Sequence, residues 1–303
     1  MFTTLRNSNL VQAELFQKTP PRLNDKLRCR SYPEGRDQRD GADWSIRKFW
    51  NVVTDREAQK KSCSLDPAFL RRKQQMRLPD VDWSRYNQQV LFVDRHDTVR
   101  ARMAAGMLDI ATNWNGMDLA VVLDRCGVDA EPSGYMDPSR AASLLSMAQA
   151  SGVSSRHFTR QFQCFEVDDF YRYDVIIALD TGVLERLMSA AEEEAASALT
   201  PGYLQYFQSK TARLSDFSGW CSDAELTREG GTALLPRSLS GQLAPGLAEA
   251  RGVVDIPRPD LSSPEAYAQW DAMKCSILLG NAGLLQYLKD SWPKDMPHWS
   301  EPN

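Results

Sequence analysis

Apolar runs alternate with helix-forming stretches from about residue 89 onward, and this order constrains the fold more than any other feature of the chain. Short apolar runs predict strands at 90–93, 119–123, 174–179 and 212–217. Apolar residues at helical spacing predict helices at 102–114, 138–151, 182–198 and 262–288, the last with a capping box formed by Ser262 and Glu265. Strands separated by helices form a parallel sheet that is covered on both faces. We therefore expect an α/β domain.

The stretch VLFVDRHDTVRAR, residues 90–102, is the first candidate site. Ligands of open parallel sheets bind at the carboxyl ends of the strands, and a strand, a tight loop and a helix in this order direct backbone amides at one spot that suits an anion. The candidate anion-binding residues are Arg95, His96, Asp97, Thr98, Val99 and Arg100. The first loop residue, Asp94, places a negative charge where the anion would bind.

Composition excludes several classes of protein. Hydrophobic residues make up 42% of the 303 residues, yet no run approaches the roughly 20 apolar residues of a membrane span. The six cysteines are scattered without metal-ligand spacing and there are three histidines, so we expect no metal, no cofactor and a reduced, intracellular compartment. Three adjacent loop residues such as Asp94, His96 and Asp97 rarely converge on one ion, which argues against a metal site in the loop.

Charge divides the chain unevenly. Residues 1–88 contain 18 Lys and Arg against 11 Asp and Glu, whereas the remainder contains 18 against 29. We expect residues 1–88 to be a basic, largely irregular extension whose aromatic residues dock onto the chain's own domain, since its acids and lack of a repeat disfavour nucleic-acid binding. The first 24 residues contain a single acid, as in a chloroplast transit segment, so a plastid location is suspected and the cytoplasm is the alternative.

Residues 89–292 form the expected domain, and residues 293–303 form a C-terminal tail. A stretch rich in Gly, Ser and Pro at about 218–252 interrupts the domain as a long surface insertion. Loops of that length are uncommon unless they cover a site, bind a partner or are disordered. The extension and the insertion are therefore the segments through which we expect the chain to bind a protein partner.

The order of these pieces resembles the low-molecular-weight protein tyrosine phosphatases. Their first strand ends in a loop of the form V-C-x5-R-S, and LFVDRHDTVRA places Asp94 at the cysteine and Arg100 at the arginine. Residues 151–187 are similar to the family's stretch G-I-x-x-H-x-A-R-Q, D-F, F-D-x-I-L-x-M-D and N-L-x-x-L. The matching positions are held by His157, Arg160, Gln161, Asp169, Phe170, Asp174, Ile176, Asp180 and Leu184. The segment VVDIPRPDLSSPEAY is similar to the family's D-P-x-x-G segment and places Asp255 at the general acid. The resemblance implies a flavodoxin-like three-layer sandwich with a four-stranded parallel sheet.

The departures from the family pattern fall in the chemistry. These phosphatases need a low-pKa thiolate to attack phosphorus. Here Asp94 replaces the thiol, Ala101 replaces the hydroxyl that follows the arginine, and Arg125 stands where the family has a serine after the second strand. Asp255 lacks the proline and tyrosines that follow the family's acid.

Two functions remain open. Ionised Asp94 and Asp97 would repel a phosphate dianion by about 4 kcal/mol per contact at about 4 Å, unless Arg95 and Arg100 neutralise them in internal ion pairs. The favoured interpretation is a catalytically inactive phosphatase-like domain that acts as a protein-interaction module or a structural subunit of a larger assembly. The alternative is an active phosphomonoester hydrolase in which Asp94 replaces the cysteine as nucleophile with the help of magnesium.

Overall fold

The computed structural model describes residues 67–81, 83, 87–131, 134–136, 138–197, 202–226 and 234–292. All of them belong to one compact unit, residues 56–303. None of the helices in these ranges is long and apolar enough to cross a membrane. The predicted C-terminal tail, residues 293–303, lies outside the described residues.

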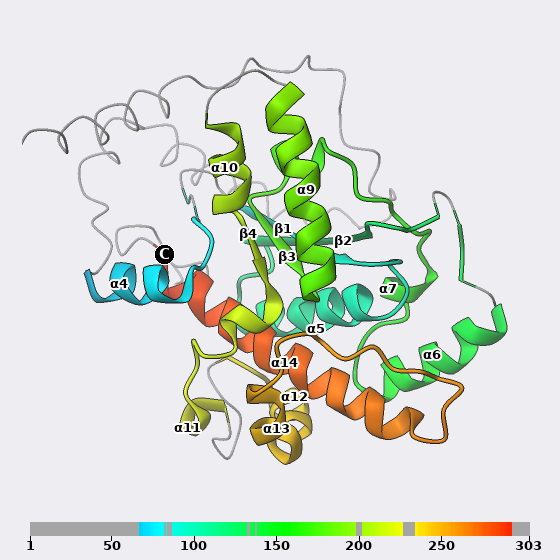
Figure 1. Ribbon diagram of the computed structural model, residues 1–303. Helices are drawn as coiled ribbons and strands as arrows, with labels where there is room; N and C mark the ends of the chain where they lie inside the picture. Colours follow the sequence, from blue (N-terminus) through cyan, green and yellow to red (C-terminus); the bar gives the residue numbers. More distant parts are fainter. Residues whose placement is uncertain are drawn as a thin grey trace, which may run out of the picture. The chain divides into compact units, whose positions relative to one another are not determined.

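A four-stranded parallel sheet forms the centre of this unit (Figure 1). Its strands are β1 (Gln88–Asp94), β2 (Val121–Gly127), β3 (Val175–Ala178) and β4 (Thr211–Arg213), in the spatial order β2-β1-β3-β4. Val90 in β1 pairs with Leu123 on one side and Val175 on the other. The predicted parallel sheet is confirmed. β2 begins two residues later than predicted, and β4 gives way after Arg213 to a 3-10 turn, η1 (Leu214–Phe217), where the Asp216 carboxylate accepts the Arg213 N–H.

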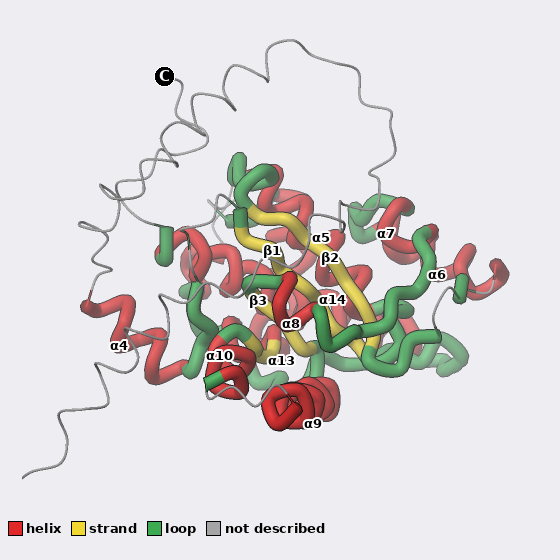
Figure 2. Tube along the Cα trace, turned by 90° about the horizontal axis from the view of Figure 1, so that it is seen from above, coloured by secondary structure: helices red, strands yellow, loops and turns green. Residues whose placement is uncertain are grey.

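Helices cover both faces of the sheet (Figure 2). Alternate strand residues point to opposite faces. Val90, Phe92 and Ile177 pack with α5 (Arg100–Trp114) and α14 (Ala266–Asp290). Leu91, Val93 and Ile176 pack on the other side with α9 (Thr181–Ser197) and α10 (Tyr203–Ser209). The predicted three-layer α/β sandwich is confirmed.

Further helical segments lie outside the helices named above. They are α4 (Pro67–Met76), α6 (Pro138–Ala150), α7 (Arg156–Thr159), α8 (Asp169–Arg172), α11 (Asp223–Leu226), α12 (Arg237–Leu243), η2 (Ala244–Gly246) and α13 (Leu247–Arg251). The last four lie in the predicted insertion, so its description as a loop was wrong. Its leucines explain the helices, because they are buried in the core that contains α14: Leu226, Leu234, Leu235, Leu239, Leu243 and Leu247.

The part of the predicted extension that is described docks onto the domain. α4 lies within it, so this part of the predicted extension contains a helix. Phe69 of α4 stacks on Tyr287 of α14 at 5.6 Å between ring centroids, and Trp83 Nε1 donates to Ser291 Oγ at 3.0 Å. The docking predicted for the aromatic side chains at Trp44, Phe49, Trp50 and Trp83 is thus confirmed for Trp83, and the other three lie outside the described residues. Residues 1–66 lie outside the described residues.

Helix α14 starts differently from the prediction. Glu265 is its N-cap and makes no side-chain capping hydrogen bond, and Ser262 Oγ instead donates to Asp260 Oδ1 at 2.6 Å. The predicted capping box was therefore wrong, because Ser262 donates both its N–H and its Oγ to Asp260 in an Asx-type turn before the helix. Farther along α14, Gly280 and Gly283 face η1: a Cβ on Gly283 would lie 2.6 Å from the Phe217 carbonyl carbon.

Asp169, one of the residues that match the family pattern, is a buried carboxylate at the start of α8. It is 6% exposed, its Oδ2 accepts the Glu166 N–H at 3.0 Å, and its Oδ1 lies 3.4 Å from Arg172 Nη1. Burial raises the pKa of Asp169 to about 6, although the Glu166 N–H and Arg172 oppose the shift. Between about pH 4 and pH 6, the folded state therefore keeps a proton on Asp169 that the unfolded chain has already released.

This difference predicts a pH effect on stability. Because the pKa of Asp169 is higher in the folded state, its contribution to the free energy of unfolding decreases as the pH rises from about 4 to about 6, by on the order of 2 to 3 kcal/mol. Urea unfolding at pH 4.5 and pH 7 should show that Asp169→Asn gains more stability relative to wild type at pH 7 than at pH 4.5. Asp168→Asn measures the effect of losing an exposed carboxylate next to it. Equal gains for Asp169→Asn at both pH values would contradict the assignment.

Candidate functional site

The cradle loop, residues 94–100, connects the carboxyl end of β1 to α5 at the edge where the sequence predicted it. Asp97 adopts φ 50°, a left-handed conformation that turns the chain toward the helix. Gly127 at the end of β2 permits this path, because a Cβ there would lie 2.6 Å from the Asp97 nitrogen. Arg95 and His96 are exposed, whereas Asp94, Asp97 and Arg100 are buried.

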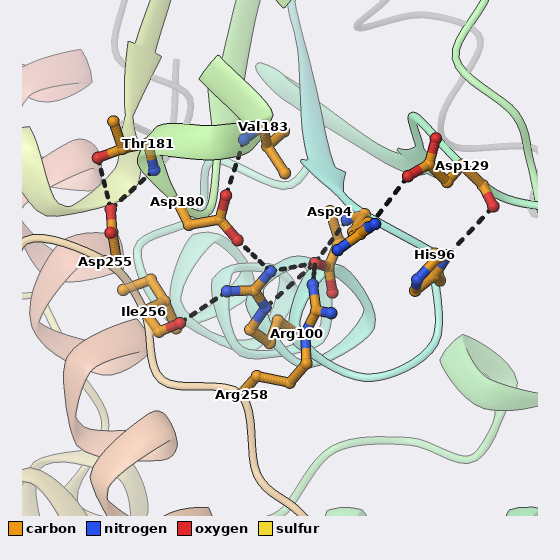
Figure 3. Close-up of polar contacts among 11 residues, drawn as sticks. Asp94, His96, Arg100, Asp129, Asp180, Thr181, Val183, Asp255, Ile256 and Arg258 are labelled. Carbon is orange, nitrogen blue, oxygen red and sulfur yellow. Dashed lines mark hydrogen bonds and ion pairs between the residues drawn. The ribbon is translucent and has the colours of Figure 1, made fainter. Parts of the chain in front are cut away.

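Asp94 and Arg100 form an ion pair inside the loop (Figure 3). Asp94 Oδ1 accepts from Arg100 Nε at 3.1 Å and Nη2 at 2.5 Å, and from the Arg95 backbone N–H at 2.6 Å. Arg100 Nη2 also donates to Asp180 Oδ2 at 2.5 Å, just after β3. The carboxylate at position 94 thus occupies the arginine and one of the amides that an anion cradle would offer to a ligand.

The opposite charges in this cluster stabilise the ionised forms of Arg100 and Asp180. Burial alone would lower the pKa of Arg100, but Asp94 and Asp180 outweigh it and raise that pKa. Burial would likewise raise the pKa of Asp180, but its hydrogen bond with Arg100 lowers that pKa. The side chains of Asp94 and Arg100 are only 4% and 3% exposed, so their attraction is little screened by solvent. The pair is a charged, water-excluded unit.

A segment that we call the strap, residues 254–258, crosses the carboxyl ends of the strands. Its Val254 carbonyl accepts from Ser215 Oγ at 2.5 Å, beyond β4. Its Ile256 N–H donates to the Leu179 carbonyl at 3.0 Å, and the Ile256 carbonyl accepts from Arg100 Nη1 at 2.7 Å. The strap therefore uses a further N–H group of Arg100 and covers the cradle loop.

Asp255, the position of the predicted general acid, lies in the strap but is bound elsewhere. Its Oδ1 accepts from both the backbone N–H and the Oγ of Thr181, each at 2.7 Å, at the first residue of α9. Figure 3 shows this carboxylate beside Thr181, apart from the Asp94 and Arg100 side chains. Asp255 serves as a helix cap in this arrangement.

Replacing Asp255 by alanine should therefore lower the free energy of unfolding by about 1 kcal/mol, the usual cost of losing a side-chain helix cap. Urea denaturation measures the effect. Asp271→Ala, which removes an exposed acid paired with Lys274 three residues away, is the matched control and should change stability by less than about 0.5 kcal/mol. An Asp255→Ala protein as stable as wild type would show that the cap contributes nothing.

A second buried ion cluster lies under the loop. Asp97 Oδ2 contacts Arg102 Nη2 at 3.3 Å and also pairs with Arg125 Nη1 and with the Gln163 N–H. Burial raises the pKa of Asp97 although both arginines oppose the shift, and burial lowers the pKa of Arg102 to about 10 against the effect of Asp97. The cluster joins the loop, α5, β2 and the segment after α7.

The other candidate loop residues do not converge on one point. Arg95 Nε donates to Asp129 Oδ2 at 3.0 Å, and His96 Nδ1 lies 3.1 Å from the Asp129 carbonyl oxygen. Val99 is buried and its carbonyl accepts the Met103 N–H. Thr98 is half-buried. Within the described ranges, no group of three His, Cys, Asp or Glu side chains is placed to hold a metal ion.

Part of the chain that contains the cradle loop matches a family model. Residues 89–216 match the model of a family described as low molecular weight phosphotyrosine protein phosphatase. The predicted resemblance is confirmed. This phosphatase-like segment begins in β1 and ends in η1, so it contains the cradle loop and Asp180 but not the strap.

Solved phosphatase structures align with about two thirds of this chain and nearly all of their own. The similar structures include YfkJ from Bacillus subtilis, with 17% identity over 67% of this chain and 95% of that one at a TM-score of 0.43. They also include a protein tyrosine phosphatase from Entamoeba histolytica, with 14% identity over 67% and 97% at 0.44. A Drosophila arginine phosphatase has 21% identity over 66% and 97% at 0.43. No curated protein matches the sequence.

Two arginines of the second ion cluster were not predicted to pair with Asp97. Arg102 stands two residues after Arg100 in a helix whose neighbouring positions are apolar, and a charged residue in such a stretch was the available signal. Arg125 was noted only as a departure from the family pattern. Arg125 lies 28 positions from Asp97, and Arg102, which is close to Asp97 in sequence, also donates to the Phe158 carbonyl 56 positions away, so spacing alone does not reveal these contacts.

Proposed function

We propose that this chain is a non-catalytic, phosphatase-like domain that binds a protein partner or serves as a subunit of a larger assembly. The observation that carries the proposal is the buried ion pair between Asp94 and Arg100, because an internal carboxylate uses the donors that would bind a phosphoryl group. A bound dianion would have to displace that carboxylate and would then lie against two negative charges, Asp94 and Asp180.

The cysteines that are described offer no substitute nucleophile. Catalysis by a thiol requires a depressed pKa and access to the substrate. Burial instead raises the pKa of Cys126, Cys164 and Cys275, and raises that of Cys221 to about 12. These thiols are therefore protonated at neutral pH and behave as small packing residues.

The alternative function is phosphate-ester hydrolysis with Asp94 as nucleophile. Its Oδ1 already accepts three hydrogen bonds, and the residue is 3% exposed. In-line attack on phosphorus needs an accessible carboxylate oxygen, whereas this one is held against Arg100 under the strap. The position of the side chain therefore disfavours the alternative.

A turnover assay separates the two functions. Purified full-length protein should not hydrolyse an aryl phosphate, with or without magnesium, beyond the rate of the Asp94→Asn variant. Hydrolysis that Asp94→Asn abolishes would establish the nucleophilic role of Asp94 and refute the non-catalytic function.

The partner and location belong to the same proposal. The predicted partner-binding segments are the extension and the insertion, and the insertion's leucines are already buried against its own domain, so its outer face is left for contact. Pull-down from native extract with the full chain, compared with a chain lacking residues 1–66, tests the extension without removing α4 or Trp83. Loss of co-purifying protein on deletion supports a role for the extension, and retention would place the interface elsewhere.

The location of the protein is tested separately. Mapping the mature N-terminus distinguishes the plastid from the cytoplasm.

A further inference from the structure

Three arginines surround the closed cradle loop with their side chains about half exposed. Arg95, Arg186 and Arg258 are 56%, 53% and 47% exposed, and we call them the rim arginines. The carboxylates that they contact are much less exposed, 26% for Asp129 and 4% for Asp94. The charge that faces solvent at these positions is therefore positive.

Two of the rim arginines share one carboxylate, and the third contacts the carboxylate that precedes Arg95 in the chain. Arg95 and Arg186 contact the two oxygens of Asp129, Oδ2 and Oδ1 respectively. Arg258 Nη2 lies 3.6 Å from Asp94 Oδ1, the same atom that accepts the Arg95 backbone N–H at 2.6 Å. Figure 3 shows Arg258 reaching the cradle loop from the strap side. The three side chains thus come from the cradle loop, α9 and the strap, and each contacts a carboxylate at the carboxyl end of β1 or just after β2.

Most of the N–H groups of these arginines remain available to a ligand. A guanidinium carries five N–H donors in a planar fork that fits a carboxylate. Among the described residues, Arg95 uses Nε on Asp129, Arg186 uses Nη1 on the same residue, and Arg258 makes one ion-pair contact. The internal carboxylates hold the guanidinium groups in place without saturating them.

We propose that the rim arginines form a docking surface for an acidic protein segment, whose Asp or Glu carboxylates bind across the edge of the sheet over the strap. This proposal rests on the proposed non-catalytic function and adds a binding surface separate from the extension and the insertion. Protein carboxylates suit the site better than a nucleic-acid backbone, because residues 89–303 carry 18 Lys and Arg against 29 Asp and Glu and would repel an extended polyanion. A short acidic segment contacts the rim without facing the rest of that negative surface.

The test uses the full-length chain and a synthetic peptide of alternating Glu and Ser residues, followed by isothermal titration calorimetry at two salt concentrations. The peptide should bind wild type, and binding should weaken as salt screens the exposed charges. Each Arg→Gln change at positions 95, 186 and 258 should weaken binding about two- to fivefold, and the triple variant about 20-fold. The control triple variant Arg156→Gln, Arg160→Gln, Arg172→Gln makes the same change in net charge at exposed arginines outside the rim, the extension and the insertion, and should bind as wild type does.

Three outcomes would overturn the docking surface. They are absence of peptide binding to wild type, equal weakening in the rim and control triple variants, and tighter binding of a single-stranded oligonucleotide than of the Glu peptide. Each leaves the proposed function standing if the aryl phosphate assay still shows no turnover. Turnover that depends on Asp94 would instead refute the proposed function, whatever the peptide does.

Discussion

Replacing Arg102 by methionine should destabilise the protein by about 3 to 5 kcal/mol, the cost of breaking a buried ion pair by removing one partner. Arg102 is fully buried, and its Nε donates to the Asp97 carbonyl at 2.6 Å. Its Nη1 donates to the carbonyls of Phe158 and Arg160 at 2.9 and 3.0 Å. Methionine fills much of the volume but removes the donor from the carbonyls of Asp97, Phe158 and Arg160, and it leaves Arg125 as the one remaining arginine on the Asp97 carboxylate among the described residues.

Urea unfolding measures this loss, and Arg160→Met is the matched control. Arg160 is exposed and contributes its carbonyl, not its side chain, to the contact with Arg102. Its substitution should change the free energy of unfolding by less than about 0.5 kcal/mol. If Arg102→Met were no more destabilising than Arg160→Met, the second ion cluster would not hold the loop to the domain.

Replacing Gly283 by alanine should cost about 3 kcal/mol, although alanine is the better helix former by about 1 kcal/mol. The new Cβ would overlap the Phe217 carbonyl group and lie 3.2 Å from the Phe217 Cβ. Both are fixed parts of η1, so α14 or η1 has to move. Because α14 and η1 pack together in the core on one face of the sheet, the shift should disturb the packing of that core.

Gly241→Ala is the comparison for this variant. Gly241 lies within α12, and a Cβ there would have no atom within 4 Å. Its substitution should stabilise the protein by about 0.5 to 1 kcal/mol through helix propensity and a restricted unfolded chain. Thermal unfolding should show a lower midpoint temperature than wild type for Gly283→Ala and a higher one for Gly241→Ala. A Gly283→Ala protein that is more stable than wild type would contradict the close approach of α14 and η1.

The fold was predictable because its strands are buried on both faces. Val90–Val93 and 175–179 are continuous apolar runs, the pattern of a central parallel strand. β2 was placed too early because its second half contains Asp124 and Arg125, which are polar. Their partners are Tyr173 and Asp97 from distant parts of the chain, so a polar strand residue could not be distinguished from a loop residue by periodicity.

The position of the candidate site in the chain was predictable, but the partners that its side chains contact were not. The spacing between Asp94 and Arg100 placed both residues in one loop, and their ion pair agrees with the expected neutralisation. Arg95 was expected to do the same, but its side chain binds Asp129 and only its backbone N–H reaches Asp94. Asp255 was matched by position alone, and its cap on Thr181 depends on a contact between residues 74 positions apart.

Inorganic phosphate binding to the wild-type chain and to Asp94→Ala tests whether an internal carboxylate occupies the anion cradle. Removing the carboxylate frees the Arg100 Nε and the Arg95 N–H, so calorimetry should show phosphate binding at least about tenfold tighter in Asp94→Ala than in wild type. Asp168→Ala makes the same change in charge just before α8 and should leave the affinity unchanged. Equal or weaker phosphate binding in Asp94→Ala, with its fold intact by circular dichroism, would contradict the account.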